Sequence, residues 1–246
     1  MKRVSQVLII IFMAFLAVLL AIGKDSIVID KFIVMPEWNS SVVYPVDDPD
    51  APCEIESFVI PKGVRALPEN AFSGCAKLTS VELPDSLEKI GKNAFQDCVS
   101  LETIVIPDSV TKVESGAFQG CTALKDITFS AGVEEISDHL FYGCTSLREF
   151  NTPESICSIG ESAFESSGIK NIDFTRSLGV IGDNAFHNCP NLTDIRLLMG
   201  KYNISDSAFD YTVRFSIPEW SPMAGWVYDH GYMYTIYKTQ WGKYEL

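Results

Sequence analysis

The chain has 246 residues, 47% of them apolar, so it can build a substantial hydrophobic core. Its 19 lysines and arginines stand against 32 aspartates and glutamates, which gives a net charge of −13. That balance argues against nucleic-acid binding, where cations must neutralise phosphates, and against simple adsorption to an anionic membrane surface.

The first 23 residues have the pattern of a secretory signal peptide. Lys2 and Arg3 precede an apolar run over residues 7–22, and Ala21 and Gly23 are small residues suited to a cleavage site. The run is shorter than the roughly 20 residues that a membrane-spanning helix needs. We therefore expect cleavage after Gly23 and a secreted or cell-surface protein. An uncleaved membrane anchor over residues 4–23 remains the alternative.

Residues 24–52 are predicted to form an N-terminal strand, a linker and a cap for the rest of the chain. The β-branched residues of 27–34 favour one strand, and several prolines after it favour a loop. Asp47, Asp48 and Asp50 suggest a calcium loop, but the glycine and distal glutamate of such a loop are missing. A solvated linker is the better interpretation.

A unit of 22 or 23 residues recurs between residues 53 and 217. Its most regular mark is a phenylalanine, found at Phe72, Phe95, Phe118, Phe141, Phe164, Phe186 and Phe209. Self-similarity at a fixed period predicts a solenoid, in which each repeat forms one coil and stacked coils share a core.

Each unit contains a short strand phrase of the form L-x-x-I-x-I, as in Leu101, Ile104 and Ile106. Its last two apolar residues are two apart and share one face of a strand. A second apolar pair three residues apart comes next, as in Leu87 and Ile90. Glycines directly after this pair are expected to allow a turn into the phenylalanine corner; they are Gly91, Gly160 and Gly182.

The strand phrase resembles the leucine-rich repeat, and the whole unit, with its wording IP…SV…IG…AF…GC…L, resembles the BspA-type repeat of secreted and surface-displayed microbial proteins. The resemblance implies a repeat solenoid of about seven 22–23-residue coils, with a parallel β-sheet on one side and short turns or helical corners on the other. Serines such as Ser86 and Ser155 replace the usual asparagine ladder and are expected to bond turn backbone groups. The fifth coil is one residue short, which predicts an irregularity around residues 166–168.

Five of the seven cysteines share one column of the repeat: Cys75, Cys98, Cys121, Cys144 and Cys189. Their side chains would run parallel from coil to coil, so we expect buried, reduced thiols in place of disulfides. Cys157 falls at an outward position and is predicted to be exposed, whereas the pattern does not assign Cys53. No metal site is predicted, because the cysteines and histidines do not cluster.

No catalytic site is predicted. The three histidines, His139, His187 and His230, lack a nucleophile in a suitable sequence context, and no nucleotide-binding, hydrolase or metalloprotease motif occurs. Nothing in the sequence implies a cofactor. The chain is therefore interpreted as a non-enzymatic protein.

The outward positions of the strands form the candidate binding surface, since solenoids commonly bind along such extended faces. The candidate protein-binding residues are Glu82, Thr103, Asp126, Thr128, Glu149, Asn151, Asn171, Asp173, Asp194 and Arg196. The face drifts from hydroxyl-rich to acidic, which favours a partner with a basic surface. Ordinary solvated strand residues are the alternative. The resemblance implies adhesion to a host, matrix or other extracellular protein; a tethered envelope scaffold without a ligand is the second hypothesis.

Residues 218–246 are rich in tryptophan and tyrosine and are predicted to cap the last coil. Ser221 and Pro222 are suited to start a helix, Gly231 to end it in the left-handed conformation, and residues 232–237 to form a strand. An aromatic ligand-binding patch is the alternative role.

Overall fold

A computed structural model describes residues 27–29, 32–34, 43–45, 53, 55–198, 200 and 202–238. The predicted signal peptide, the acidic linker residues and the last eight residues of the aromatic cap lie outside this part. Among the described residues, no helix has the length and apolar character needed to cross a bilayer.

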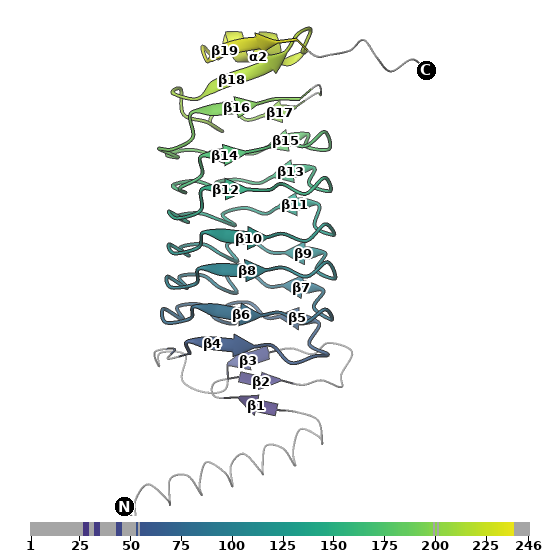
Figure 1. Cartoon of the computed structure of the whole chain (residues 1–246), viewed down its shortest axis with the longest axis vertical. Coiled ribbons are helices and arrows are strands. Elements are labelled where there is room, and N and C mark those ends of the chain that lie inside the picture. Colours follow the sequence, from purple (N-terminus) through teal and green to yellow (C-terminus); the bar gives the residue numbers. More distant parts are fainter. Residues whose placement is uncertain are drawn as a thin grey trace, which may run out of the picture.

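The chain forms a solenoid of stacked coils, which confirms the predicted fold (Figure 1). One row of parallel strands runs along the stack: β4 (Ser57–Val59), β6 (Ser80–Glu82), β8 (Thr103–Val105), β10 (Asp126–Thr128), β12 (Glu149–Phe150), β14 (Asn171–Ile172), β16 (Asp194–Arg196) and β18 (Arg214–Pro218). The strands pair one repeat apart in separate groups, β4 with β6, β8 with β10, β12 with β14, and β16 with β18, as Ile104 does with Ile127. This row carries the candidate binding residues.

A second row of two-residue parallel strands lies on the other side of each coil: β5 (Ala66–Leu67), β7 (Lys89–Ile90), β9 (Lys112–Val113), β11 (Glu135–Ile136), β13 (Ser158–Ile159), β15 (Val180–Ile181) and β17 (Asn203–Ile204). The second apolar residue of each pair, such as Ile90, points into the core from this row. The corners between the two rows are turns, and the described coils contain no helix.

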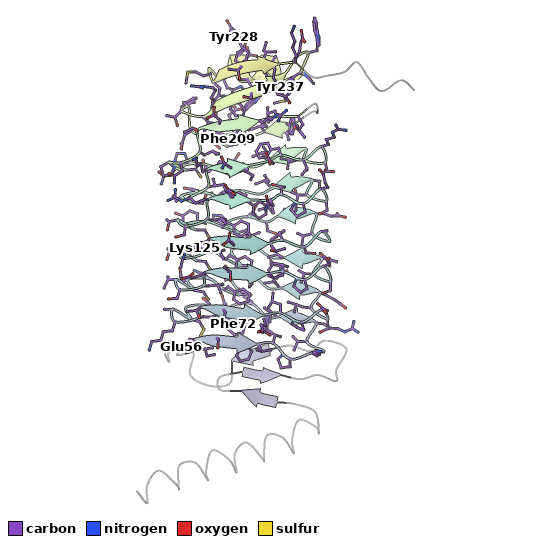
Figure 2. The ribbon with its side chains drawn as sticks, viewed as in Figure 1. Glu56, Phe72, Lys125, Phe209, Tyr228 and Tyr237 are labelled. Atoms are coloured by element: carbon purple, nitrogen blue, oxygen red, sulfur yellow. A yellow bond between two sulfur atoms is a disulfide. The ribbon has the colours of Figure 1, made fainter. Side chains whose placement is uncertain are left out.

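The predicted phenylalanine column forms the centre of the core. All seven rings are buried, and successive ring centroids lie 5.0–5.9 Å apart in a stacked arrangement. Figure 2 labels Phe72 and Phe209 near the two ends of this stack. Each of the five inner rings therefore lies between the rings of the coil before and the coil after, which links the coils through one continuous core.

In the first six phenylalanine corners, two residues have left-handed backbone conformations, one two positions before the phenylalanine and one two positions after it. Asn93 and Asp97 show the pattern, with φ of 55° and 57°. His139 occupies the first of these positions, with φ of 56°. Asparagine, aspartate and glycine tolerate this region best, which explains their frequency around each Ala-Phe pair.

The sequence predicts that Gly91, Gly160 and Gly182 allow turns, but the structure requires glycine there for a different reason. None of the three has a positive φ. A Cβ atom at Gly91 would lie 2.6 Å from the carbonyl carbon of Pro68, so glycine is needed here because adjacent coils approach closely. The turns themselves depend on the left-handed residues that come after these glycines.

The short fifth coil is irregular, as predicted. The turn that follows the cysteine position in other coils is missing, and Gly168 lies against the previous coil. A Cβ atom on Gly168 would lie 2.1 Å from the carbonyl oxygen of Thr145, a contact no side chain tolerates. Only glycine therefore fits at the deletion.

Four cysteines of the column are buried free thiols, as predicted, and each is a hydrogen-bond donor. The Sγ atoms of Cys98, Cys121, Cys144 and Cys189 each donate to a phenylalanine carbonyl of an earlier coil, at 3.1 Å. Burial raises the pKa of the Cys98 and Cys144 thiols to about 12, so they remain protonated. Each of these carbonyls also accepts a hydrogen bond from a backbone N–H of its own coil, as Phe95 does from Cys98 at 3.2 Å, so the thiol supplies a second hydrogen bond that links neighbouring coils.

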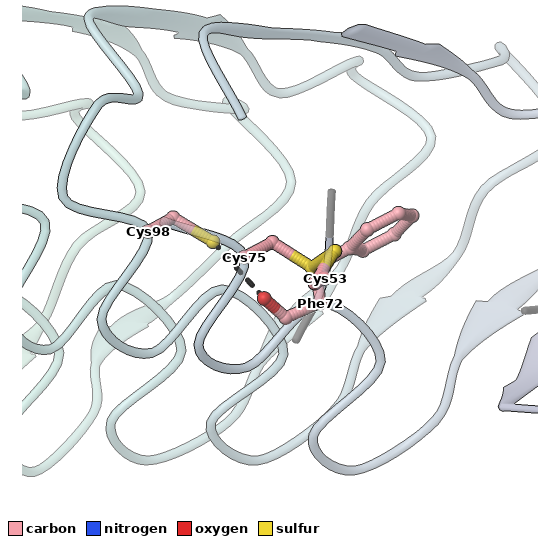
Figure 3. The surroundings of a disulfide bond; sticks show 4 residues. All are labelled: Cys53, Phe72, Cys75 and Cys98. Carbon is pink, nitrogen blue, oxygen red and sulfur yellow. Dashed lines mark hydrogen bonds between the residues drawn. A yellow bond between two sulfur atoms is a disulfide. The ribbon is translucent and has the colours of Figure 1, made fainter. Parts of the chain in front are cut away.

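Cys75 departs from the prediction, because it forms a disulfide with Cys53 (Figure 3). Cys53 precedes Cys75 by 22 residues and so lies one position outside the 23-residue column. Its side chain is therefore free to point at Cys75, and the two Cα atoms are 4.8 Å apart, within the range that a disulfide requires.

The serine prediction holds for two members of its column. The Ser86 hydroxyl donates to the Val64 carbonyl at 2.9 Å, and the Ser155 hydroxyl donates to the Val133 carbonyl at 2.6 Å. Ser109 is an exception, because its buried hydroxyl has no partner in the described part of the chain.

At the N-terminal end, the single strand predicted for residues 27–34 is instead a hairpin. β1 (Ile27–Ile29) pairs antiparallel with β2 (Phe32–Val34), which pairs antiparallel with β3 (Val43–Pro45). The β-branched composition of this segment does not distinguish one strand from two antiparallel strands. This small sheet lies at the β4 end of the stack in Figure 1.

The C-terminal helix and strand form as predicted. Ser221 accepts a hydrogen bond from the Met223 amide at 3.2 Å, Pro222 already has helical dihedrals, and α2 (Met223–Asp229) comes next. Gly231, with φ of 71°, ends the helix and leads to β19 (Met233–Tyr237). β19 pairs in parallel with β18 and ends the first row of strands.

Candidate binding face

All ten candidate residues are exposed, and all lie in or directly after the strands of the first row. We call the outward side of this row, from β4 to β18, the strand face. Its alternating pattern is clearest in β8, where Thr103 and Val105 are exposed and Ile104 is buried. Pairing aligns outward residues from coil to coil, as Asp126 with Thr103 and Glu149 with Asn171. The sequence pattern thus placed these residues on one surface.

The acidic residues of the strand face differ in whether their carboxylates already have a hydrogen-bond or ion-pair partner. Glu149 accepts a hydrogen bond from the Asn171 amide at 3.2 Å. Asp194 accepts one from the Thr193 hydroxyl at 2.8 Å and lies 3.9 Å from the Arg214 guanidinium. Asp126 and Asp173 have no ion-pair or side-chain hydrogen-bond partner among the described residues, so their carboxylates are available to a partner.

A basic column that the sequence analysis did not identify borders the strand face. Lys125, Arg148 and Lys170 are exposed and immediately precede their strands. The Lys170 amide donates to the Arg148 carbonyl at 2.8 Å, and the Lys125 amide donates to the carbonyl of Glu102, one coil earlier, at 2.9 Å. The Lys125 ammonium also pairs with the Glu102 carboxylate at 3.1 Å. Figure 2 shows Glu56 and Lys125 on the same edge of the stack. The acidic drift therefore runs beside a row of cations.

The C-terminal end of the strand face is also cationic. The Arg196 guanidinium lies over the Tyr237 ring, 4.7 Å from its centroid, and the Tyr237 hydroxyl donates to the Leu197 carbonyl at 2.8 Å. These contacts join the aromatic cap to the strand face. Because Arg196 and Arg214 both lie here, positive charge follows the acidic coils along the stack.

The cap covers the interior of the last coils. Val227 and Tyr232 are buried, and the Tyr232 hydroxyl donates to the Phe209 carbonyl at 3.1 Å, as the thiols donate to phenylalanine carbonyls in earlier coils.

His230 connects α2 to the last coil, since its Nε2 lies 2.8 Å from the Asp206 Oδ1 atom. The hydrogen bond to the Trp226 carbonyl, and then the Asp206 carboxylate, raise the pKa of His230 above its ordinary value of 6.5.

The remaining histidines and the exposed cysteine lie apart from one another. His187 Nδ1 lies 2.9 Å from Asp210 Oδ1. Cys157 is exposed, as predicted, and its Sγ donates a hydrogen bond to the Glu134 carbonyl at 3.2 Å. In the part of the chain that the structure describes, no group of three or more acidic, histidine or cysteine side chains is arranged to hold a metal ion.

Solved structures with the same architecture are bacterial leucine-rich repeat proteins. A leucine-rich repeat protein of T. pallidum is 25% identical, with a TM-score of 0.51, over 65% of this chain and 86% of that one. One from Eubacterium ventriosum reaches a TM-score of 0.61 at 24% identity, over 74% of this chain and half of that protein.

A Faecalibacterium prausnitzii protein described as a leucine rich cell surface protein is 26% identical over 76% of this chain and 61% of its own length, with a TM-score of 0.45. No curated protein matches the sequence. The model of the BspA type leucine rich repeat region matches residues 51–167 and 113–219, in six copies. The chain therefore belongs to the BspA-type leucine-rich repeat family.

Proposed function

We propose that the chain is a secreted or cell-surface binding protein, adhesin-like, that presents its strand face to another extracellular protein. The observation that carries the proposal is the run of exposed, mostly polar residues along the first row, with the unpartnered carboxylates of Asp126 and Asp173 in its central coils. Leucine-rich repeat membership supports a protein-interaction role, because solenoids of this kind offer extended binding surfaces.

The charges of the strand face suggest what a partner must offer. Asp126 and Asp173 would be matched by lysine or arginine on the partner, whereas the bordering Arg148 and Lys170 would be matched by acidic groups. Lys125 is already paired with Glu102, at 3.1 Å. Charge complementarity of this kind chiefly increases association rates and selectivity. The proposed partner is an extracellular or host matrix protein whose surface carries a row of basic residues beside acidic residues. The sequence alone suggested only that the partner surface is basic.

The experiment is a binding screen of residues 24–246 against extracellular matrix and cell-surface proteins at low and high salt. A variant with Asp126→Asn and Asp173→Asn tests the strand face. A matched variant with Glu134→Gln and Glu135→Gln removes two exposed carboxylates from the opposite side of the coils. Binding that weakens with salt and with the first variant alone supports the proposal. Equal loss in both variants, or in neither, contradicts it.

A tethered envelope scaffold without a ligand is the second candidate function, and it rests on the apolar run in residues 7–22. It requires that this segment stay attached. Sequencing the N-terminus of the exported protein distinguishes the two: a chain that starts at Lys24 is incompatible with the tethered form.

A further inference from the structure

β19 ends the row of parallel strands with an open edge. It pairs with β18 on one side, and no described strand pairs with its other side, which we call the β19 edge. In earlier coils the inward strand positions are buried, as Phe215 and Ile217 are in β18. Tyr234 and Ile236 occupy the same register positions in β19, yet 39% and 61% of their surface is exposed. The stack thus ends on apolar side chains that are only partly covered.

The residues of β19 do not protect this edge. Edge strands of soluble proteins commonly carry a charge, a proline or a bulge that prevents another strand from pairing. The five residues Met233–Tyr237 contain none of these: they are uncharged and consist of methionine, tyrosine, threonine and isoleucine. Of these residue types, tyrosine, threonine and isoleucine favour strands. The β19 edge is therefore suited to accept a further strand through backbone hydrogen bonds.

The two ends of the stack differ, and this difference selects the occupant. The β4 end carries the β1–β3 sheet and the Cys53–Cys75 disulfide, so it does not offer the same open edge to a head-to-tail neighbour (Figure 1). A contact between two C-terminal ends is isologous and closes after two copies. We propose that a second copy of this chain docks on the β19 edge, with the two β19 strands antiparallel and Thr235 at the two-fold axis.

This arrangement is complementary in both side chains and charge. Centring the pair on Thr235 matches all five residues and sets Tyr234 opposite the partner's Ile236, a favourable aromatic and β-branched pair. Asp229 precedes β19 and Lys238 follows it, and both are exposed. Antiparallel pairing places Lys238 towards the start of the partner strand, which α2 and its Asp229 precede, and it keeps the two Lys238 side chains at opposite ends of the pair.

The dimer would also extend the strand face. Directly opposite residues in an antiparallel pair point to the same side of the sheet. The strand faces of the two copies would therefore lie on one side of a continuous sheet. The inference does not depend on what the strand face binds.

The test is the association state of the chain produced with its native N-terminus, measured by sedimentation equilibrium over a wide range of concentrations. A single-strand contact is small, so we expect a reversible dimer at micromolar concentrations. Ile236→Lys places two like charges across the proposed axis and should give a monomer. Val105→Lys is the matched control, because Val105 is exposed to a similar degree, 63%, on a central strand, and it should leave the dimer unchanged.

A second readout is covalent. In a Cys157→Ser background, Thr235→Cys should give a disulfide-linked dimer on mild oxidation, because position 235 faces itself across the axis, whereas Val105→Cys should not. A protein that is monomeric at all concentrations and does not cross-link through position 235 would overturn the proposal. A dimer that persists in the Ile236→Lys variant would also overturn it. So would a dimer that forms only after residues 239–246 are removed, because this result would mean that the C-terminal residues occupy the β19 edge in the full chain.

Discussion

Replacing Phe118 by alanine tests the core of the solenoid at its centre. The ring is fully buried, and its centroid lies 5.4 Å from that of Phe95 and 5.9 Å from that of Phe141. Truncation removes one layer of a continuous stack, and the rigid coils above and below cannot close the gap. Phenylalanine-to-alanine changes in such sites cost about 3–5 kcal/mol. For a domain of this size the melting temperature should fall by about 6–20 °C, at about 2–4 °C per kcal/mol.

The measurement is thermal unfolding followed by circular dichroism, with denaturant unfolding to obtain the free energy. Val105→Ala is the control, because Val105 points outward from the neighbouring strand β8 and a surface truncation should change stability by no more than about 0.5 kcal/mol. If Phe118→Ala and Val105→Ala melt within about 2 °C of each other, where a loss of at least about 6 °C is expected, the continuous stack does not supply the stability assigned to it.

Three further predictions concern other parts of the chain. Gly168→Ala should destabilise the protein by about 1–3 kcal/mol, because its Cβ would clash with the Thr145 carbonyl; unchanged denaturant unfolding would contradict the tight fifth coil. The pKa of His230 is raised, so its stabilisation of the cap is present below pH 6.5 and is lost as pH rises through the raised value. Hydrogen exchange in α2, corrected for the intrinsic exchange rate at each pH, should therefore quicken as pH rises above 6.5, and Asp206→Asn should weaken this pH dependence. Under native conditions Cys157 should react first with a thiol reagent, and the buried thiols should react only on unfolding; equal reactivity would contradict the burial of the column.

The first row of strands and the phenylalanine stack could be predicted because they repeat at a fixed period. Ile104 and Phe118 have counterparts in every copy, so each position is supported several times over. The second row was not foreseen as strands, since two residues such as Lys89 and Ile90 are too few to show the alternation that marks a strand.

Features that break the period were the ones missed. The disulfide partner of Cys75 lies 22 residues away, one position outside the column, so the column argument could not identify Cys53. The basic column was missed for another reason. Lys125 and Arg148 occupy corner positions, which simple alternation assigns to the interior although the bend turns them outward.

The hydrogen bonds to the phenylalanine carbonyls give the stack a direction. Where the cysteine column is unbroken, a coil supplies a donor to the coil before it and receives one from the coil after it, as Cys121 donates to Phe95 and Cys144 donates to Phe118. A whole coil inserted or removed between these would leave every junction of the same kind. The number of coils, and with it the length of the molecule, can therefore change in steps of about 5 Å. The ends have no such freedom, because the first is closed by a disulfide and the last by the Tyr232 hydroxyl. Duplication of a coil therefore fits only in the middle of the stack.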